Sequence, residues 1–196
     1  ARTAGGAVSN PDAANAPSAK NETTADVEDF IAKMKTIAPS TTGLPGRLVL
    51  AMDATMSRQP TWDMALALQS DMFTVVKDIG GLDVQLVFFR GMNECRASRW
   101  VSDPTGLARL MTSVTCRGGL TQLARVLTHA AQESAKRRVN AVVFVGDAME
   151  EDIDYVCSKA GALGLLGVPV FLFQEGADPN VTRAYTEIAR LTKGAT

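Results

Sequence analysis

The segment that most constrains the fold covers residues 47–57 and reads RLVLAMDATMS. It begins as an unbroken apolar run and ends in an acid and two hydroxyls at alternate positions, Asp53, Thr55 and Ser57. A continuous apolar run bounded by turn residues is typical of a strand buried on both faces, as central parallel strands are. Pro60 follows and suits the first turn of a helix. We therefore expect these three residues on a loop at the carboxyl edge of a sheet, where open α/β folds bind ligands.

Strand-like apolar runs alternate with helical patterns through the rest of the chain. Gly91-Met92-Asn93 resembles a hairpin turn, which would make the strands on either side of it antiparallel at a sheet edge. The alternation predicts an α/β fold, with a doubly wound, mostly parallel central sheet flanked by helices and one antiparallel edge strand. The predicted strands cover residues 47–53, 82–90, 95–101, 139–146 and 168–173, and the predicted helices cover 60–79, 104–114, 122–136, 151–166 and 179–191.

Three regions are expected along the chain. Residues 1–22 are rich in Ala, Gly, Asn, Ser and Pro without apolar periodicity, which predicts a disordered or low-complexity segment. Residues 23–46 are expected to form a short amphipathic helix, whose apolar face includes Val27, Phe30 and Ile37, followed by a linker. The folded domain is expected over 47–196. A last strand of the sheet is expected to follow the helix over 179–191 and to lie beyond residue 196.

The charge balance, the apolar stretches and the cysteines indicate which kinds of partner and surroundings suit this chain. The 196 residues carry 20 Lys and Arg against 21 Asp and Glu, so the near balance of charge gives no general attraction to nucleic acid or to an anionic membrane. The apolar stretch over 161–173 is interrupted by Gly and Pro and is too short to span a bilayer. The three cysteines are far apart and contain no CxxC pair, which favours a reducing, cytoplasmic setting over a disulfide framework or a zinc site.

Two more loops are expected to bring oxygen ligands to the same sheet edge. Thr121 follows Gly118-Gly119-Leu120, and Asp147 follows the apolar strand AVVFVG. Together with Asp53, Thr55 and Ser57, these residues form a set of carboxylate and hydroxyl oxygens, the ligands that suit Mg²⁺ or Mn²⁺. The sequence therefore predicts a divalent metal site built from three loops.

These motifs resemble those of the von Willebrand factor type A (VWA) domain. That family carries a metal-ion-dependent adhesion site, built from an Asp-x-Ser-x-Ser loop, a Thr from a second loop and an Asp from a third. Here Asp53-Ala54-Thr55-Met56-Ser57 has Thr at the middle position, which keeps the hydroxyl. The family's Gly-Gly-Thr is interrupted by Leu120, and Gly146-Asp147-Ala148 stands in place of its Thr-Asp-Gly. The resemblance covers residues 47–193.

The resemblance implies a protein-binding module rather than an enzyme. Mg²⁺ or Mn²⁺ would be held by Asp53, Thr55, Ser57, Thr121 and Asp147, and an Asp or Glu carboxylate of a partner protein would complete the metal's coordination. Neutral hydroxyl ligands leave the cation electrophilic towards such an acid. Neither nucleic-acid binding nor membrane insertion is expected.

Two alternative functions remain open at this stage. The first is a metal-assisted phosphoryl-transfer enzyme with Asp53 at the tip of its first strand, although Thr55 stands where an acid/base carboxylate would be needed and the one histidine, His129, lies inside a predicted helix. The second is a metal-free structural scaffold that assembles through its N-terminal amphipathic helix.

Simpler roles are also open for the same residues. Asp53, Ser57 and Thr121 can cap helices, Thr121 being the expected cap of the helix over 122–136. The acidic residues Glu150, Glu151, Asp152 and Asp154 are expected to favour the N-terminus of the helix that begins near residue 151.

Overall fold

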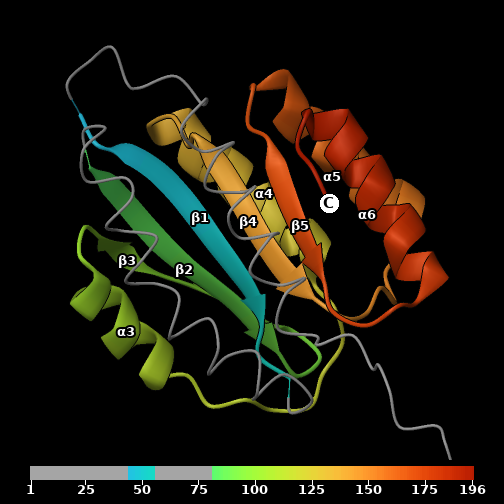
Figure 1. The fold of residues 1–196 in the computed structure, drawn as a ribbon, viewed down its shortest axis with the longest axis horizontal. Coiled ribbons are helices and arrows are strands. Elements are labelled where there is room, and N and C mark those ends of the chain that lie inside the picture. Colours follow the sequence, from blue (N-terminus) through green and yellow to red (C-terminus); the bar gives the residue numbers. More distant parts are fainter. Residues whose placement is uncertain (1–43, 56–80) are drawn as a thin grey trace, which may run out of the picture.

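The computed structural model describes residues 44–55 and 81–196 (Figure 1). Its strands are β1 (Gly46–Asp53), β2 (Leu82–Arg90), β3 (Glu94–Val101), β4 (Ala141–Gly146) and β5 (Val170–Gln174). Its helices are α3 (Pro104–Thr112), α4 (Leu123–Lys136), α5 (Ile153–Leu165) and α6 (Pro179–Thr192). The predictions for segment 1–22, for the amphipathic helix after it, for Ser57 and for the helix over 60–79 lie outside the described residues.

β1 lies at the centre of the sheet, as its unbroken apolar run predicts. The described strands form one sheet in the order β3-β2-β1-β4-β5. β1 pairs in parallel with β2 and with β4, and β4 pairs in parallel with β5. β2 and β3 pair antiparallel through a turn at Gly91, whose φ of 62° is readily adopted by glycine. The predicted doubly wound, mostly parallel sheet with one antiparallel edge strand is confirmed.

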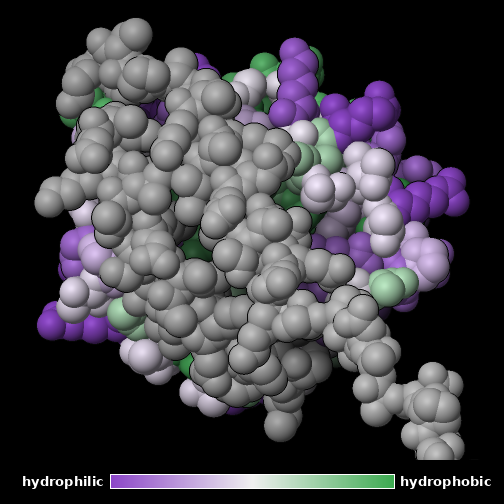
Figure 2. Space-filling model, viewed as in Figure 1, coloured by the Kyte–Doolittle hydropathy of each residue, from purple (hydrophilic) through white to green (hydrophobic). Residues whose placement is uncertain are grey.

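The described helices cover both faces of this sheet (Figure 1). α4, α5 and α6 pack on one face, where their apolar side chains meet those of the alternate strand residues, such as Val49 and Phe144. α3 packs on the other face, where Leu107 and Met111 meet Leu48 and Leu86. In the same view the outer surface over α6 is mainly hydrophilic, as expected of a helix that buries a single face (Figure 2).

The sequence places most element ends within two residues. The strand predicted over 139–146 begins at Ala141, after one residue that bonds a side chain of the preceding helix and one that already bonds β1. The Val139 N–H donates to Ser134 Oγ at 3.2 Å. The Asn140 N–H donates to Arg47 O at 2.8 Å, and Asn140 Oδ1 accepts from the Arg47 N–H at 2.9 Å.

The residues after α6 return to the edge of the sheet. Ala195 makes a parallel bridge with Phe171, and its carbonyl accepts from the Leu172 N–H at 2.9 Å. Gly194 lies so close to β5 that an added Cβ would stand 1.7 Å from Val170 O, so only glycine fits there.

Two further expectations can be compared with the described residues. None of the helices in 81–196 has the length and the apolar character needed to cross a bilayer. Cys95, Cys116 and Cys157 are half-buried and form no disulfide.

Candidate functional site

The first loop of the candidate site leaves the carboxyl end of β1. Asp53, the last residue of β1, and Thr55 are both buried, at 5% and 8% exposed. Asp53 Oδ1 accepts a hydrogen bond from the Thr55 N–H at 2.8 Å, which fixes the turn out of the strand. Between them, the Ala54 N–H continues the sheet by donating to Phe89 O at 3.0 Å. The carboxylate of Asp53 is therefore held in place at the tip of the central strand.

The second loop, residues 113–122, lies against β1 and against the β2–β3 turn. The Arg117 N–H donates to Ala54 O at 2.9 Å, Gly118 O accepts from the Gly91 N–H at 3.0 Å, and the Leu120 N–H donates to Gly91 O at 3.2 Å. Gly119 approaches this turn so closely that an added Cβ would stand 2.2 Å from Gly91 N. The glycine pair thus allows backbone-to-backbone packing beside the first loop.

Leu120, the residue inserted into the Gly-Gly-Thr motif, turns outward and is 42% exposed, whereas the next residue, Thr121, is 5% exposed. The insertion therefore bulges towards solvent, and the threonine that follows it stays buried at the sheet edge. The Thr121 hydroxyl donates to Ala148 O at 3.2 Å, which connects the second loop to the third.

The expected role of Thr121 as a helix cap is wrong. α4 begins at Leu123 with Gln122 as its N-cap residue, and the Gln122 side chain makes no capping bond. Glu151, 28 residues further along the chain, takes that role by accepting from the Leu123 N–H at 2.5 Å and from the Ala124 N–H at 3.2 Å. A carboxylate at a helix N-terminus also interacts favourably with the helix dipole.

The third loop, residues 147–152, supplies the acids of the site. Asp147 follows β4 directly and is half-buried. Glu150 Oε2 accepts from the Thr121 N–H at 3.0 Å. Asp152 caps α5 by accepting from the Tyr155 N–H at 2.8 Å. The expectation that the acidic residues serve the helix that follows them is thus right for Asp152 and for Asp154, which lies in the first turn of α5, and wrong for Glu151, which serves α4.

Burial and hydrogen bonding act in opposite directions on Glu151. Removal from water raises the pKa of its carboxyl, while the N–H groups of Ala124 and Leu123 lower it. The roles of Glu150 and Glu151 were missed at the sequence level, because each partner lies almost thirty residues away and no local motif marks the contact.

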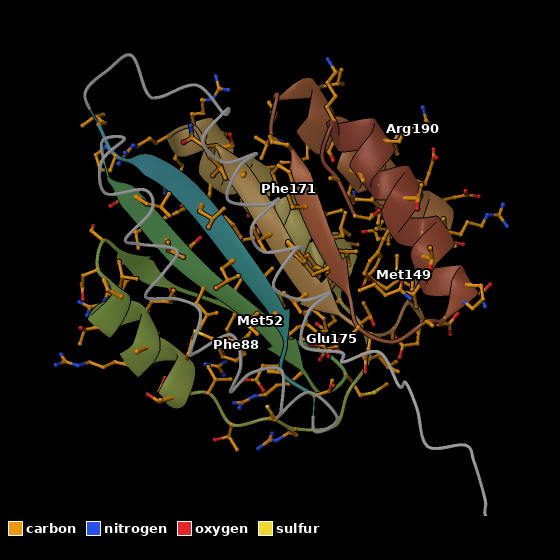
Figure 3. All side chains as sticks on the ribbon, viewed as in Figure 1. Met52, Phe88, Met149, Phe171, Glu175 and Arg190 are labelled. Atoms are coloured by element: carbon orange, nitrogen blue, oxygen red, sulfur yellow. The ribbon has the colours of Figure 1, made fainter. Side chains whose placement is uncertain are left out.

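Four of the five predicted ligands thus lie on three loops at one edge of the sheet, and these loops are joined by hydrogen bonds. Figure 3 labels Met52, Phe88 and Glu175 close to the carboxyl ends of β1, β2 and β5, which mark this edge. Among residues 44–55 and 81–196, no group of three or more His, Cys, Asp or Glu side chains is placed to hold a metal ion. A cation here would therefore need the hydroxyl oxygens as well as the carboxylates. That mixed set of oxygen donors fits Mg²⁺ or Mn²⁺.

His129 has a structural environment. Its Nε2 lies 2.8 Å from Gln85 Oε1 on β2, and burial lowers the pKa of its imidazole. A side-chain hydrogen bond within the helix–sheet interface accounts for this residue without catalysis.

Comparison with known proteins places the fold. No protein family model and no curated protein matches this sequence. Among solved structures, the SpRpn10 VWA domain matches with a TM-score of 0.57 at 13% identity, over 78% of this chain and 86% of that one. The pilus adhesin SpaC from Lactobacillus rhamnosus GG matches with a TM-score of 0.61 at 9% identity, over 81% of this chain and 28% of that one. The D319A mutant of the PilB minor pilin from Streptococcus sanguinis matches with a TM-score of 0.56 at 10% identity, over 81% of this chain and 59% of that one.

At these sequence identities the structural similarity supports a shared fold and nothing further. The strand order, the antiparallel edge pair and the similarity to a VWA domain agree with the resemblance found in the sequence motifs. The described part of this chain therefore has a VWA-like α/β fold.

Proposed function

We propose that this chain is a protein-binding module that holds its partner through a divalent cation, Mg²⁺ or Mn²⁺. Asp53, Thr55, Thr121 and Asp147 would hold the cation at the carboxyl edge of the sheet, with Ser57 as a further ligand. The bound ion would supply an open coordination position for an Asp or Glu carboxylate of the partner protein. This chain's loops would position the ion and select the partner.

The observation that carries the proposal is the environment of Thr121. A buried threonine before a helix ordinarily serves as its cap. Here Glu151 bonds the first N–H groups of α4, so the Thr121 hydroxyl is not needed for that purpose. As the donor to Ala148 O, the hydroxyl keeps oxygen lone pairs to offer to a cation. This buried hydroxyl bonds Ala148, the residue after Asp147, and its loop bonds Ala54, the residue after Asp53, which supports a metal site shared by the three loops.

The balance of charge supports an acidic partner. Hydroxyl ligands are neutral, so the ion would keep positive charge that an incoming carboxylate can satisfy. The two aspartates need not both touch the metal, since a carboxylate can also act by orienting a metal-bound water.

The experiment is a calorimetric titration of Mg²⁺ and Mn²⁺ into the wild type, Thr121→Val and Thr128→Val. Valine keeps the shape of threonine and removes the hydroxyl. Thr128 is the matched control, because its hydroxyl donates to Ala124 O at 2.7 Å within the same helix, α4. We expect Thr121→Val to weaken cation binding at least about tenfold and Thr128→Val to leave it unchanged. Equal affinity in all three proteins would contradict the proposed ligand set.

Two alternatives make different predictions. A phosphoryl-transfer enzyme would hydrolyse a simple phosphate ester such as p-nitrophenyl phosphate with Mg²⁺ and lose that activity in Asp53→Asn; we expect no such hydrolysis. A metal-free scaffold would lose its partner when residues 1–40 are deleted and keep it in Asp53→Asn, which is the reverse of our expectation.

The cellular location stays a prediction. Three cysteines without a disulfide favour a reducing compartment such as the cytoplasm, while two of the similar structures are a pilus adhesin and a minor pilin.

A further inference from the structure

Two large apolar side chains are exposed beside the candidate site. Met92, in the β2–β3 turn, is 69% exposed, and Leu120 is 42% exposed. Their loops are in direct contact, because the Leu120 N–H donates to Gly91 O at 3.2 Å and the Gly91 N–H donates to Gly118 O at 3.0 Å. We call this pair, Met92 and Leu120, the apolar rim.

The apolar rim is held rigidly next to the proposed metal ligands. Leu120 directly precedes Thr121, and the close approach of Gly119 to Gly91 leaves no room for a side chain between the two loops. A single exposed apolar residue is ordinary on a protein surface. Two of them on preorganised loops at a candidate binding site are typical of a contact surface.

Charge is distributed unevenly around the same edge. Arg117 is exposed on the loop that carries Leu120, and its backbone is anchored by the bond to Ala54 O. The neighbouring loop carries the acids Asp147, Glu150 and Asp152, and Glu150 reaches the residue after Leu120 by accepting from the Thr121 N–H. An acidic partner segment is therefore favoured beside Arg117 and disfavoured beside Glu150 and the rest of residues 147–152, so its carboxylate should approach the apolar rim from the side of Arg117.

We propose that the apolar rim selects the partner, by contacting a large apolar side chain next to the carboxylate that binds the cation. This inference rests on the proposed function and names its partner chemistry: an exposed protein segment in which Asp or Glu has a Leu-sized neighbour. The residue that interrupts the Gly-Gly-Thr motif thereby becomes a determinant of specificity, because the insertion is what turns Leu120 outward.

The experiment uses the full chain at saturating Mg²⁺ and three fluorescent peptides with central sequences Leu-Glu-Leu, Ser-Glu-Ser and Leu-Gln-Leu, read by anisotropy. Burial of one Leu-sized side chain should make Leu-Glu-Leu bind about tenfold more tightly than Ser-Glu-Ser. Leu-Gln-Leu, without the carboxylate, should bind far more weakly than Leu-Glu-Leu. In the double variant Met92→Ser/Leu120→Ser, the advantage of Leu-Glu-Leu over Ser-Glu-Ser should fall below about twofold.

Two controls separate the possible failures. Leu165→Ser removes an apolar side chain that is 91% exposed at the C-terminal end of α5, away from the site loops, and should keep the preference for Leu-Glu-Leu. Calorimetry with Mg²⁺ alone should give the same affinity for the wild type and the double variant. If the wild type binds no Mg²⁺, the proposed function fails and the inference fails with it. If Mg²⁺ binds but the wild type shows no preference for Leu-Glu-Leu, or binds no peptide at about 1 mM, the apolar rim is overturned while the metal site stands.

Discussion

Acid should destabilise this fold through Glu133, a buried carboxylate near the C-terminal end of α4, whereas the candidate site lies at the N-terminal end of that helix. Its two oxygens accept from Lys136 Nζ at 2.6 Å, from Trp100 Nε1 at 3.0 Å and from Arg47 Nη2 at 2.9 Å. The bonds from Lys136, Trp100 and Arg47 together outweigh burial and lower the pKa of Glu133 from 4.5 to about 2. The Arg47 guanidinium also stacks on the Trp100 ring, 3.7 Å from its centroid.

The size and sign of the effect follow from these values. A group whose pKa is lowered on folding stabilises the native state above its unfolded pKa, here 4.5, and that contribution is lost as the pH falls towards 2. A gap of about 2.5 pH units at about 1.4 kcal/mol each gives about 3 kcal/mol at pH 7 and about 1.4 kcal/mol at pH 3. Lys136 is 71% exposed, so water and salt screen its share and bring the value at pH 7 closer to about 2 kcal/mol.

The assay is urea unfolding of the wild type and Glu133→Gln, followed by far-ultraviolet circular dichroism at pH 7 and pH 3. The variant should be less stable at pH 7 by about 2–3 kcal/mol, and the difference should shrink to about half at pH 3. Glu187→Gln is the matched control, since Glu187 pairs with Arg190 on the exposed face of α6 and should change stability little. A Glu133→Gln protein as stable as the wild type at pH 7, or a difference that grows at pH 3, would refute the reasoning.

Two further predictions concern the site loops. Glu151→Gln keeps the shape of the side chain that caps α4 but removes its charge, and should lower the free energy of unfolding by about 1 kcal/mol in thermal unfolding. It should also weaken Mg²⁺ binding in calorimetry, because the position of Thr121 is altered. An unchanged Mg²⁺ affinity would show that the Glu151 cap does not position Thr121. Gly119→Ala should separate the second loop from the β2–β3 turn, because its Cβ would stand 2.2 Å from Gly91 N. Two-dimensional NMR spectra of this variant should show shifts of the Gly91 and Thr121 signals. The control is Gly118→Ala, whose Cβ would meet nothing within 4 Å and should leave the loop in place.

The sheet could be predicted from the sequence because its signals are local. β1 and β4 are continuous apolar runs, and the turn at Gly91 separates two strands that the chain itself brings together. A buried strand with polar groups directly after it places those groups at the carboxyl edge whatever the details of the loops. For this reason Asp53, at the end of β1, and Asp147, directly after β4, come to one edge without any knowledge of their contacts.

The contacts that could not be predicted are those between segments far apart in the chain. Glu151 caps α4 from a loop after the next strand, so the cap expected from Thr121, the nearest residue with a suitable side chain, was the wrong one. Arg47 and Glu133 form an ion pair 86 residues apart, and the sequence around each gives no sign of the other. The outward turn of Leu120 depends on the packing of Gly119 against Gly91, which is also non-local.

The central claim is that a divalent cation binds at the tip of β1, and a titration of Mg²⁺ into the wild type and Asp53→Asn tests it most directly. Asparagine keeps an oxygen that can accept from the Thr55 N–H, as Asp53 Oδ1 does at 2.8 Å, so the variant loses the charge but not the turn. With a dissociation constant of about 0.1 mM, Mg²⁺ at about 1 mM would add about 1.4 kcal/mol to the free energy of unfolding, or about 3–6 °C in Tm. The account predicts saturable binding by the wild type that is lost in Asp53→Asn at equal stability without metal. Equal binding by both proteins, or no binding by a folded wild type, would contradict it.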